Sequence, residues 1–185
     1  MTKQFIVVFD TLPIQKSAVR SGENPQEVVI ACRSINVGLF VSGNLRRDTC
    51  VSIVYKKENR FACITFPGKT LRRVSPDERS IAFFLLKAYN LIEEKPVEFN
   101  IMDNGIILQY SKFDEMLQRW KSKRIHIANE EYHPEEKFQL AQEGAFIYDM
   151  RMKADISIDD MISIPRPPTP ERFILDLNLY FDGMP

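Results

Sequence analysis

The strongest structural signal in the sequence is Arg73-Val74-Ser75-Pro76-Asp77-Glu78-Arg79-Ser80-Ile81-Ala82, which has the pattern of a helix start. Ser75 is a favourable N-cap residue, Pro76 suits the first helical position, and Glu78 is placed to act as the capping-box partner. Apolar residues then recur at helical spacing over residues 81–92. The stretch therefore predicts a helix that buries this apolar face.

Strand signals precede this helix. Two β-rich runs, Thr49 to Tyr55 and Phe61 to Phe66, are separated by a short polar loop and predict a hairpin. Phe5 to Phe9 is a continuous apolar run, which predicts a buried strand. Between them, Val28 to Val41 has helical spacing and is followed by Ser42-Gly43-Asn44, which predicts a helix and its stop.

The second half of the chain alternates strand and helix patterns, which predicts an α/β sheet with helices packed on its faces. Thr169 followed by Pro170 is a capping signal for the last helix, and we prefer a helix there although Leu175, Leu177 and Leu179 also alternate like a strand. The expected strands are Ile106–Tyr110, Arg124–Ala128, Ala145–Tyr148 and Met161–Ile164, and the expected helices are Phe113–Trp120, Asp155–Asp160 and Pro170 to about Phe181.

Length and composition indicate one globular unit. With 185 residues, 44% of them hydrophobic and 27% charged, we expect a single domain over residues 1–185. The apolar runs are too short for a signal peptide or a membrane span, so we expect a cytoplasmic protein. Cys32, Cys50 and Cys63 lack C-x-x-C spacing and predict buried thiols. His126 and His133 lack the spacing of a helical metal pair, and we expect no metal site.

Charge is segregated along the chain, although the formal net charge is zero. Residues 42–87 carry ten Lys or Arg and four Asp or Glu, whereas residues 141–185 carry four bases and eight acids. Such segregation predicts a basic face of the kind that binds phosphates, unless folding intermixes the charges.

Two stretches carry a resemblance to a known family. They are Leu45-Arg46-Arg47-Asp48, just before the predicted hairpin, and residues 73–82 at the predicted helix start. Both resemble the archaeal tRNA pseudouridine-54 N1-methyltransferases (TrmY-like proteins of the SPOUT class), in the same order and at similar spacing. The likeness extends from about Cys32 to His133.

The resemblance implies a fold and an activity. The implied fold is a SPOUT-like parallel sheet flanked by helices, with a C-terminal segment threaded as a trefoil knot. The implied assembly is a homodimer that composes its active site at the subunit interface. In such a protein S-adenosylmethionine lies in the loops of the knot, and the methyl acceptor is N1 of a pseudouridine in the T-loop of tRNA.

Arginines of the two motifs are the implied RNA contacts, because the planar guanidinium pairs with phosphate oxygens bidentately. Asp77 and Glu78 are explained equally well by capping, since acids in the first turn of a helix are favoured by its dipole. Asp48 would orient the neighbouring arginines or approach the base. The predicted RNA-binding residues are Arg46, Arg47, Arg72, Arg73 and Arg79.

Acid–base chemistry makes small demands in the implied reaction, because N1 of pseudouridine has only to lose a proton as the methyl group arrives. Asp48 and Asp149 are the candidate catalytic residues.

The implied cofactor loops depart from the family pattern. Residues 145–152 lack the glycine of the family's turn, so Tyr148 or Met150 would narrow or reshape the site. Residues 163–169 contain three prolines, and each proline removes an N–H donor. Losing two hydrogen bonds would weaken binding roughly ten- to a hundredfold. The predicted cofactor-binding residues are Ile147, Tyr148, Met150, Ser163, Ile164 and Arg166.

Three hypotheses follow. The first is a tRNA-modifying methyltransferase that uses S-adenosylmethionine. The second is a SPOUT homologue with a degenerate cofactor site that binds RNA or serves as a dimeric interaction protein. The third is a dimeric interaction protein with no RNA role, which scattered rather than clustered arginines would favour.

Overall fold

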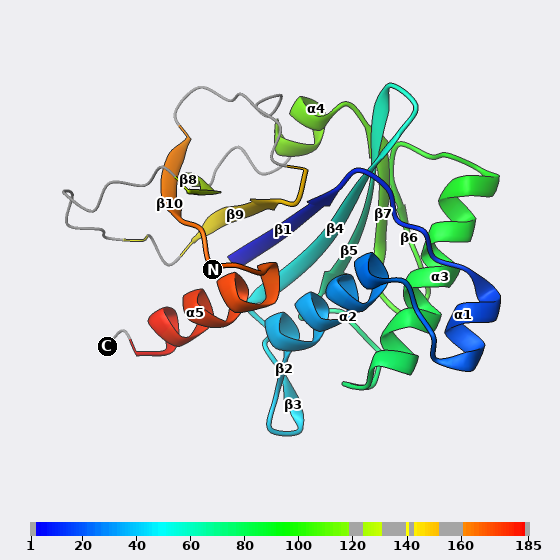
Figure 1. Cartoon of the computed structure of the whole chain (residues 1–185), viewed down its shortest axis with the longest axis horizontal. Helices are drawn as coiled ribbons and strands as arrows, with labels where there is room; N and C mark the ends of the chain where they lie inside the picture. The colour runs from blue at the N-terminus through cyan, green and yellow to red at the C-terminus, as the bar shows by residue number, and fades with distance from the viewer. Residues whose placement is uncertain (1–2, 119–123, 131–139, 141–142, 152–160, 184–185) are drawn as a thin grey trace.

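The chain folds as an α/β protein with a mixed central sheet. The computed structural model describes residues 3–118, 124–130, 140, 143–151 and 161–183. The strands are β1 (Lys3–Phe9), β2 (Phe40–Val41), β3 (Asn44–Leu45), β4 (Thr49–Lys57), β5 (Arg60–Pro67), β6 (Asn100–Ile101), β7 (Ile107–Ser111), β8 (Arg124–Asn129), β9 (Gly144–Asp149) and β10 (Ile162–Pro165). Eight of them form one sheet in the order β10-β8-β9-β1-β4-β5-β7-β6, and β2 and β3 form a separate small hairpin (Figure 1).

The sheet is parallel on one side and antiparallel on the other. Strands β10, β8, β9, β1 and β4 run parallel, whereas β5, β7 and β6 join by antiparallel pairing. This corrects the expectation of a parallel sheet. The cause is local, because only Glu58 and Asn59 separate β4 from β5, and a parallel pair needs a crossover of a dozen or more residues.

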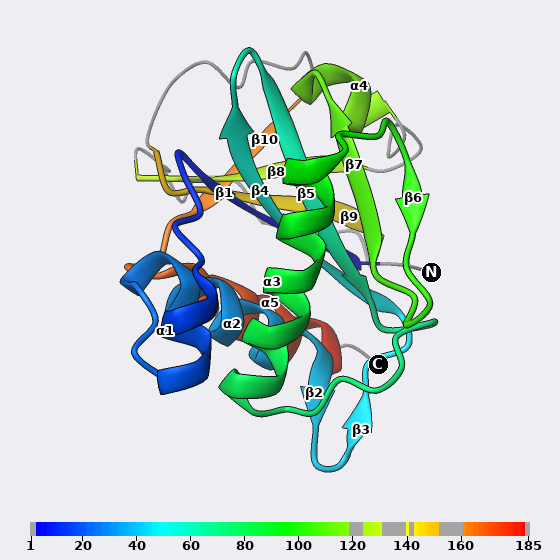
Figure 2. The same cartoon turned by 90° about the vertical axis from the view of Figure 1, so that its right-hand side faces the viewer.

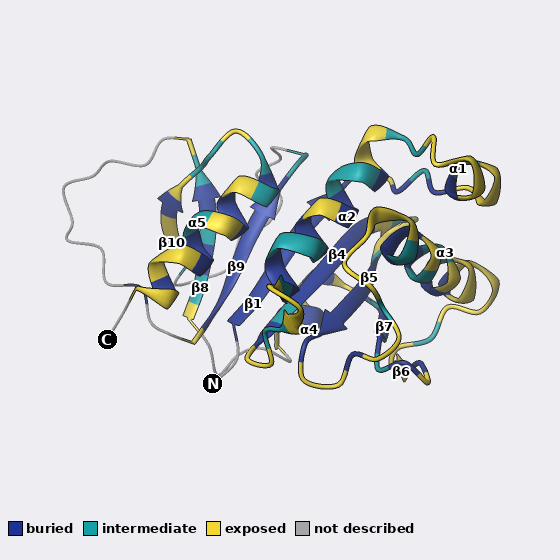
Figure 3. Cartoon of the chain, turned by 90° about the horizontal axis from the view of Figure 1, so that it is seen from below, coloured by how far each residue is buried: buried dark blue, intermediate teal, exposed yellow. Residues whose placement is uncertain are grey.

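Helices α1 (Lys16–Ser21), α2 (Gln26–Leu39), α3 (Glu78–Glu94) and α5 (Pro170–Asp182) lie on one face of the sheet, and α4 (Phe113–Gln118) lies on the other (Figure 2). Buried residues line the inner sides of these helices (Figure 3). Gly38 lets α2 approach β4, since a Cβ there would lie 2.4 Å from a methyl group of Val51. No described helix has the length and apolar character that a bilayer crossing requires.

An aromatic group connects α5 to the sheet. Phe146 on β9 stacks on His126 of β8 at 4.8 Å between ring centroids, and packs against Phe5 at 5.7 Å and Phe181 at 5.5 Å. Burial lowers the pKa of His126, so its ring is neutral and packs as an aromatic residue. This group fixes the end of α5 against the parallel half of the sheet.

Most predicted elements are confirmed, with small shifts of their ends. The last helix begins after Thr169, whose side chain caps it, and the hairpin of β4 and β5 is present. The predicted helix to Val41 was too long, because the chain turns extended at Phe40 to form β2. Cys32 and Cys63 are buried as predicted, and Cys50 is half-buried. Three predicted features lie outside the described residues: the helix over residues 155–160, the helical residue Trp120, and His133.

The cap of α3 differs from the expectation. Asp77, not Ser75, is the N-cap, and its carboxylate accepts a hydrogen bond from the Ser80 N–H at 2.7 Å. The Ser80 hydroxyl in turn accepts from the Ser75 N–H at 3.0 Å. The helix start was predicted two residues too early, because residues 72–77 form an irregular loop before the helix.

This cap predicts a difference between two neighbouring substitutions. Asp77→Ala leaves the Ser80 N–H without its acceptor and should lower the free energy of unfolding by about 1 kcal/mol. Ser75→Ala keeps the backbone donor and should change it by less than about 0.5 kcal/mol. Urea unfolding followed by circular dichroism measures both, and equal effects would contradict the assigned cap.

Candidate functional site

Three parallel strands end side by side at the edge of the sheet where the cofactor loops were predicted. Strands β8, β9 and β10 lead there into Glu130, Met150 and Arg166. The carboxyl ends of neighbouring parallel strands are the usual ligand position in open α/β sheets. This edge is therefore the first part of the candidate site.

Arg166 holds the three strand ends together. Its guanidinium lies 4.0 Å from the centre of the Tyr148 ring and donates a hydrogen bond to the Asp149 carbonyl oxygen at 2.9 Å. Its Nε lies 3.6 Å from the Glu130 carboxylate. The Tyr148 hydroxyl donates to the Pro167 carbonyl oxygen at 2.7 Å. The two predicted cofactor loops are thus tied directly to each other.

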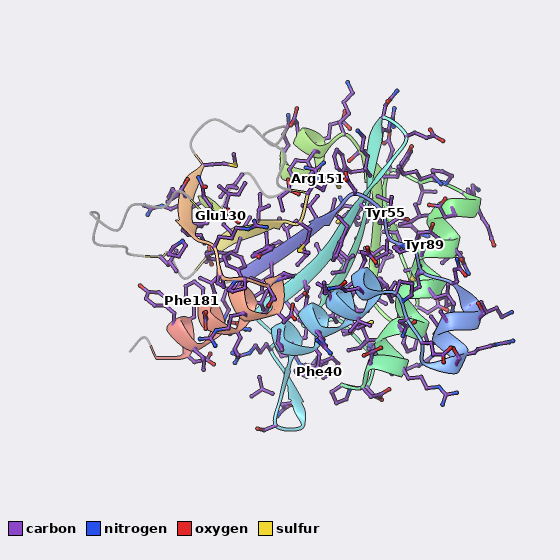
Figure 4. All side chains as sticks on the ribbon, viewed as in Figure 1. Phe40, Tyr55, Tyr89, Glu130, Arg151 and Phe181 are labelled. Carbon is purple, nitrogen blue, oxygen red and sulfur yellow. The ribbon has the colours of Figure 1, made fainter. Side chains whose placement is uncertain are left out.

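The carboxylate of Asp149 is buried, and among the described residues it is engaged by Arg151. Both of its carboxylate oxygens accept hydrogen bonds from the Arg151 guanidinium, at 2.9 and 2.8 Å, and the Arg151 N–H donates to one of them at 3.0 Å. The guanidinium also lies over the Phe61 ring, 5.2 Å from its centre. Figure 4 shows Arg151 near the strand ends, far from Phe181. This carboxylate therefore fixes the turn after β9.

A hollow of about 220 Å³ lies between β10 and α5. Its walls are mostly apolar, and the Asp176 carboxylate is its acidic group, paired with Arg172 at 2.7 Å. Glu171, at the start of α5, has a buried carboxylate oxygen with no hydrogen-bond partner among the described residues, but it does not line the hollow. The lining residues are Leu140, Ile164, Pro165, Pro167, Phe173, Asp176, Leu177 and Tyr180.

The six predicted cofactor residues are not all beside this hollow. Ile164 lines it, and Tyr148 and Arg166 form the clamp at its edge. Ile147 belongs to the core on the opposite face of the sheet, and Ser163 accepts a hydrogen bond from Asn129 at 3.4 Å. Met150 is half-buried against the main core. The sequence did not identify the α5 residues of the wall, because their burial depends on which face of the helix meets β10.

The first predicted RNA-binding motif lies on the other side of α5. Arg46 forms a bidentate ion pair with Asp182, at 2.7 and 2.6 Å, which lowers the pKa of Asp182. Arg47 donates to the Gly68 carbonyl oxygen at 3.0 Å. Gly68 is needed there, because a Cβ would lie 1.9 Å from the Arg46 carbonyl oxygen. Arg46 is thus a tether of α5, whereas Arg47 remains exposed.

Asp48 lies beside Lys3, with 3.1 Å between its carboxylate and the ammonium. Partial burial alone would raise the pKa of Asp48, but the hydrogen bond and charge of Lys3 outweigh it, so the pKa lies below its ordinary value. Asp48 stands next to residue 3 of β1, whereas Asp149 pairs with Val8. Five residues of strand separate them, about 17 Å, so the two candidate aspartates do not share a site within one chain.

The other predicted arginines follow the loop between β5 and α3. Arg72 and Arg73 are exposed, and the loop is fixed by hydrogen bonds from the Arg72 N–H to Asn104 and from Asn36 to the Pro76 carbonyl oxygen. Arg79 lies further on, in the first turn of α3, where it lines a second hollow beside α1. Arg72 and Arg73 therefore share one loop and Arg79 begins the helix that follows it, whereas Arg46 and Arg47 lie on a separate loop before β4.

Helix α5 separates the hollow from the loop before β4 that carries Arg46, Arg47 and Asp48, which we call the basic loop. Phe173, Asp176, Leu177 and Tyr180, at helical spacing, face the hollow. Asn178 and Asp182 face the other way, toward the Val37 carbonyl oxygen and Arg46. Leu175 and Leu179 remain exposed, at 39% and 60%.

Comparison with solved structures identifies the class of fold. The crystal structure of Nep1 from Archaeoglobus fulgidus, bound to S-adenosylhomocysteine, matches with a TM-score of 0.55, 11% sequence identity and coverage of 98% of both chains. The chain therefore shares the α/β fold of that structure, with a large sheet flanked by helices.

The sequence comparisons show the family. Residues 11–144 match the family described as "Putative SAM-dependent RNA methyltransferase", and the chain belongs to that family. A tRNA (pseudouridine(54)-N(1))-methyltransferase of Methanococcus maripaludis is 34% identical over 122 residues, which cover 64% of this chain and 61% of the relative. The corresponding protein of Methanococcus vannielii is 31% identical over 134 residues, covering 71% and 67%. The chain thus spans about three fifths to two thirds of these relatives.

The clamp at the strand ends predicts a measurable contribution of one hydroxyl. Tyr148→Phe keeps the ring under Arg166 but removes the hydrogen bond to Pro167, and should lower the free energy of unfolding by about 0.5 to 1.5 kcal/mol. Tyr180→Phe, at an exposed ring, is the matched control and should change it by less than about 0.5 kcal/mol. Urea titration of both variants checks this, and an unchanged Tyr148→Phe protein would contradict the clamp.

Proposed function

We propose that this chain is an S-adenosylmethionine-dependent RNA methyltransferase that methylates N1 of a pseudouridine in the T-loop of tRNA, and that it acts in the cytoplasm as a homodimer. The observation that carries the proposal is the hollow between β10 and α5, at the strand ends of a chain that belongs to an RNA methyltransferase family. The names of the relatives supply the proposed substrate.

The residues of the hollow fit part of the cofactor. Flat apolar walls from Ile164, Pro167 and Leu177 suit the adenine ring, and the Asp176 carboxylate suits ribose hydroxyls. When bound, S-adenosylmethionine supplies the methyl group. The residues of the chain bind and orient the two substrates and exclude water.

A second copy of the chain would complete the site. The hollow of about 220 Å³ is smaller than the roughly 300–1,000 Å³ of ordinary ligand sites, so it encloses only part of a cofactor. The basic loop with Arg47 and Asp48 faces away from it, across α5. The exposed leucines of α5 offer an apolar surface for the partner. In the proposed dimer, the loop of one subunit faces the hollow of the other.

Of the two candidate aspartates, Asp48 is the one with an accessible carboxylate. It is 53% exposed and ionised, whereas the carboxylate of Asp149 is held by Arg151. Its lowered pKa makes it a weak base, which suffices for a proton that leaves as the methyl group arrives. We propose that Asp48 orients or deprotonates the base and that Asp149 positions the turn after β9.

The second candidate function is RNA binding without methyl transfer. It is favoured by the clamp of Arg166 on Tyr148 and by the prolines at 165, 167 and 168, which remove N–H donors beside the hollow. The knotted threading of the C-terminal segment, implied by the resemblance, is part of the first proposal.

Cofactor binding separates these two functions. Isothermal titration of the wild-type protein with S-adenosylmethionine should show binding, and Asp176→Asn should weaken it about tenfold through loss of an ionic hydrogen bond. Arg172→Gln, which breaks only the ion pair with Asp176, is the control and should bind within about twofold of wild type. Absence of heat at millimolar cofactor would favour the RNA-binding function.

Subunit composition can be tested by mixing two impaired variants, with S-adenosylmethionine held below its Kd so that weaker cofactor binding lowers the rate. Arg47→Ala impairs the RNA side, and Asp176→Asn impairs the cofactor side. If each site uses Arg47 of one subunit and Asp176 of the other, unfolding and refolding an equal mixture should restore about a quarter of wild-type tRNA methylation, since half the dimers then hold one intact site. Each variant refolded alone is the control. A mixture no more active than its parents would place both residues of a site in one subunit.

A further inference from the structure

A second hollow, of about 460 Å³, lies between α1 and the start of α3, away from the one between β10 and α5. Figure 2 shows these two helices side by side. Its volume lies within the roughly 300–1,000 Å³ of sites that take a small ligand. It is lined by Val19, Arg20, Asp77, Arg79, Ser80 and Phe83.

The hollow has an aromatic wall that the fold does not use. Phe83 is 55% exposed, although the other side of α3 is fully buried at Ile81, Ala82 and Leu85. Its ring packs edge-on against Phe84 at 5.2 Å between centroids, which fixes the orientation of the ring. Val19, 6% exposed, forms an apolar floor. An exposed, fixed ring over an apolar floor is suited to stacking a flat ligand.

The charge of the hollow is positive. Arg20 and Arg79 are exposed and form no ion pair with another described residue. Asp77 is the one lining acid, and its carboxylate is occupied by the Ser80 N–H at 2.7 Å. Glu78 is turned toward Asn24, whose amide donates to it at 3.1 Å. The lining therefore carries two guanidinium groups and one carboxylate, a net positive charge, and neither guanidinium is paired with an acid among the described residues.

Together these features define a ligand class. Aromatic side chains that stack bases, with arginines that hold the adjoining phosphates, are the usual means of binding unpaired nucleotides. We propose that the hollow between α1 and α3 binds an unpaired nucleotide of RNA, with its base stacked on Phe83 and a phosphate held by Arg20 and Arg79. The choice of RNA rests on the proposed function, and the site adds to the motif residue Arg79 a stacking surface at Phe83 and a second arginine, Arg20, outside the motifs.

The basic loop lies next to a second loop that leads to this hollow, because Arg47 donates a hydrogen bond to Gly68 at the start of the loop between β5 and α3. The loop that carries Arg72 and Arg73 leads directly to Asp77 and Arg79 at the start of α3. A strand of RNA that follows this loop from Arg47 would reach the hollow at its far end. The site would then hold a nucleotide outside the one to be methylated and help to fix the register of the substrate.

Base stacking can be separated from phosphate binding with two short probes, an oligouridine and an abasic strand of the same length. Phe83→Ala should weaken binding of the oligouridine about tenfold and leave the abasic strand unchanged. Arg20→Gln with Arg79→Gln should weaken both. Leu91→Ala is the matched control, because Leu91 is also exposed on α3 but does not line the hollow, and it should change neither.

A fluorescence measurement gives an independent readout. Phe83→Trp adds an indole in the hollow to a chain with one tryptophan, Trp120, and the oligouridine should quench it saturably. Leu91→Trp should show no quenching beyond that of the wild-type protein. Equal affinity of Phe83→Ala and wild type for the oligouridine, or equal weakening of both probes, would overturn the proposal.

Failure of this site and failure of the proposed function give different results. If wild type and Phe83→Ala methylate tRNA equally well and bind both probes with equal affinity, the proposed stacking site is wrong and the methyltransferase function stands. If Phe83→Ala weakens oligouridine binding but the wild-type protein gives no heat with S-adenosylmethionine, the methyltransferase function is wrong and the stacking site stands. Phe83→Ala should bind the cofactor as wild type does, since the two hollows have no lining residue in common.

Discussion

The attachment of α5 at both ends is the constraint on which the candidate site depends. At its start, the Tyr148 hydroxyl holds Pro167, and at its end Asp182 pairs with Arg46. Four buried apolar side chains of α5 contribute more, at about 1.5–3 kcal/mol each against about 1 kcal/mol or less for a partly exposed ion pair. Packing therefore keeps the helix in place, and the two polar attachments fix its rotation, which decides what each side of α5 faces.

The elements of the fold were largely predictable, because they follow from local patterns. The alternation of strands with helices, the hairpin of β4 and β5, and the cap at Thr169 are all readable over a few residues. The errors were local too. Ser75 was taken as a cap where Asp77 is one, since two polar residues flank Pro76, and the helix before Phe40 was extended through a turn. The antiparallel pairing of β4 with β5 followed from the predicted hairpin, whereas the antiparallel pairing of β7 and β6 beyond it was not predicted, because the resemblance implied a parallel sheet.

The candidate site was less predictable, because its contacts join residues far apart in the chain. The position of the cofactor loops followed from the resemblance, and the proline-rich turn after β10 indeed borders the hollow. That Arg166 would cover Tyr148, or that α5 would form a wall, depends on tertiary packing. The separation of Asp48 from Asp149 required the register of β1 with β9, which no local pattern contains. Phe83 was read correctly as helical but not as exposed beside two arginines.

The ion pair between Arg46 and Asp182 spans 136 positions of the chain. During synthesis, the basic loop leaves the ribosome long before α5, and contacts of such sequence separation form late in folding. A nascent chain therefore presents the arginines that are proposed to bind phosphates before it has a wall for the hollow. Only a fully translated subunit contains both the basic loop and the hollow. RNA bound to an unfinished chain would therefore be bound without the hollow that is proposed to hold the cofactor.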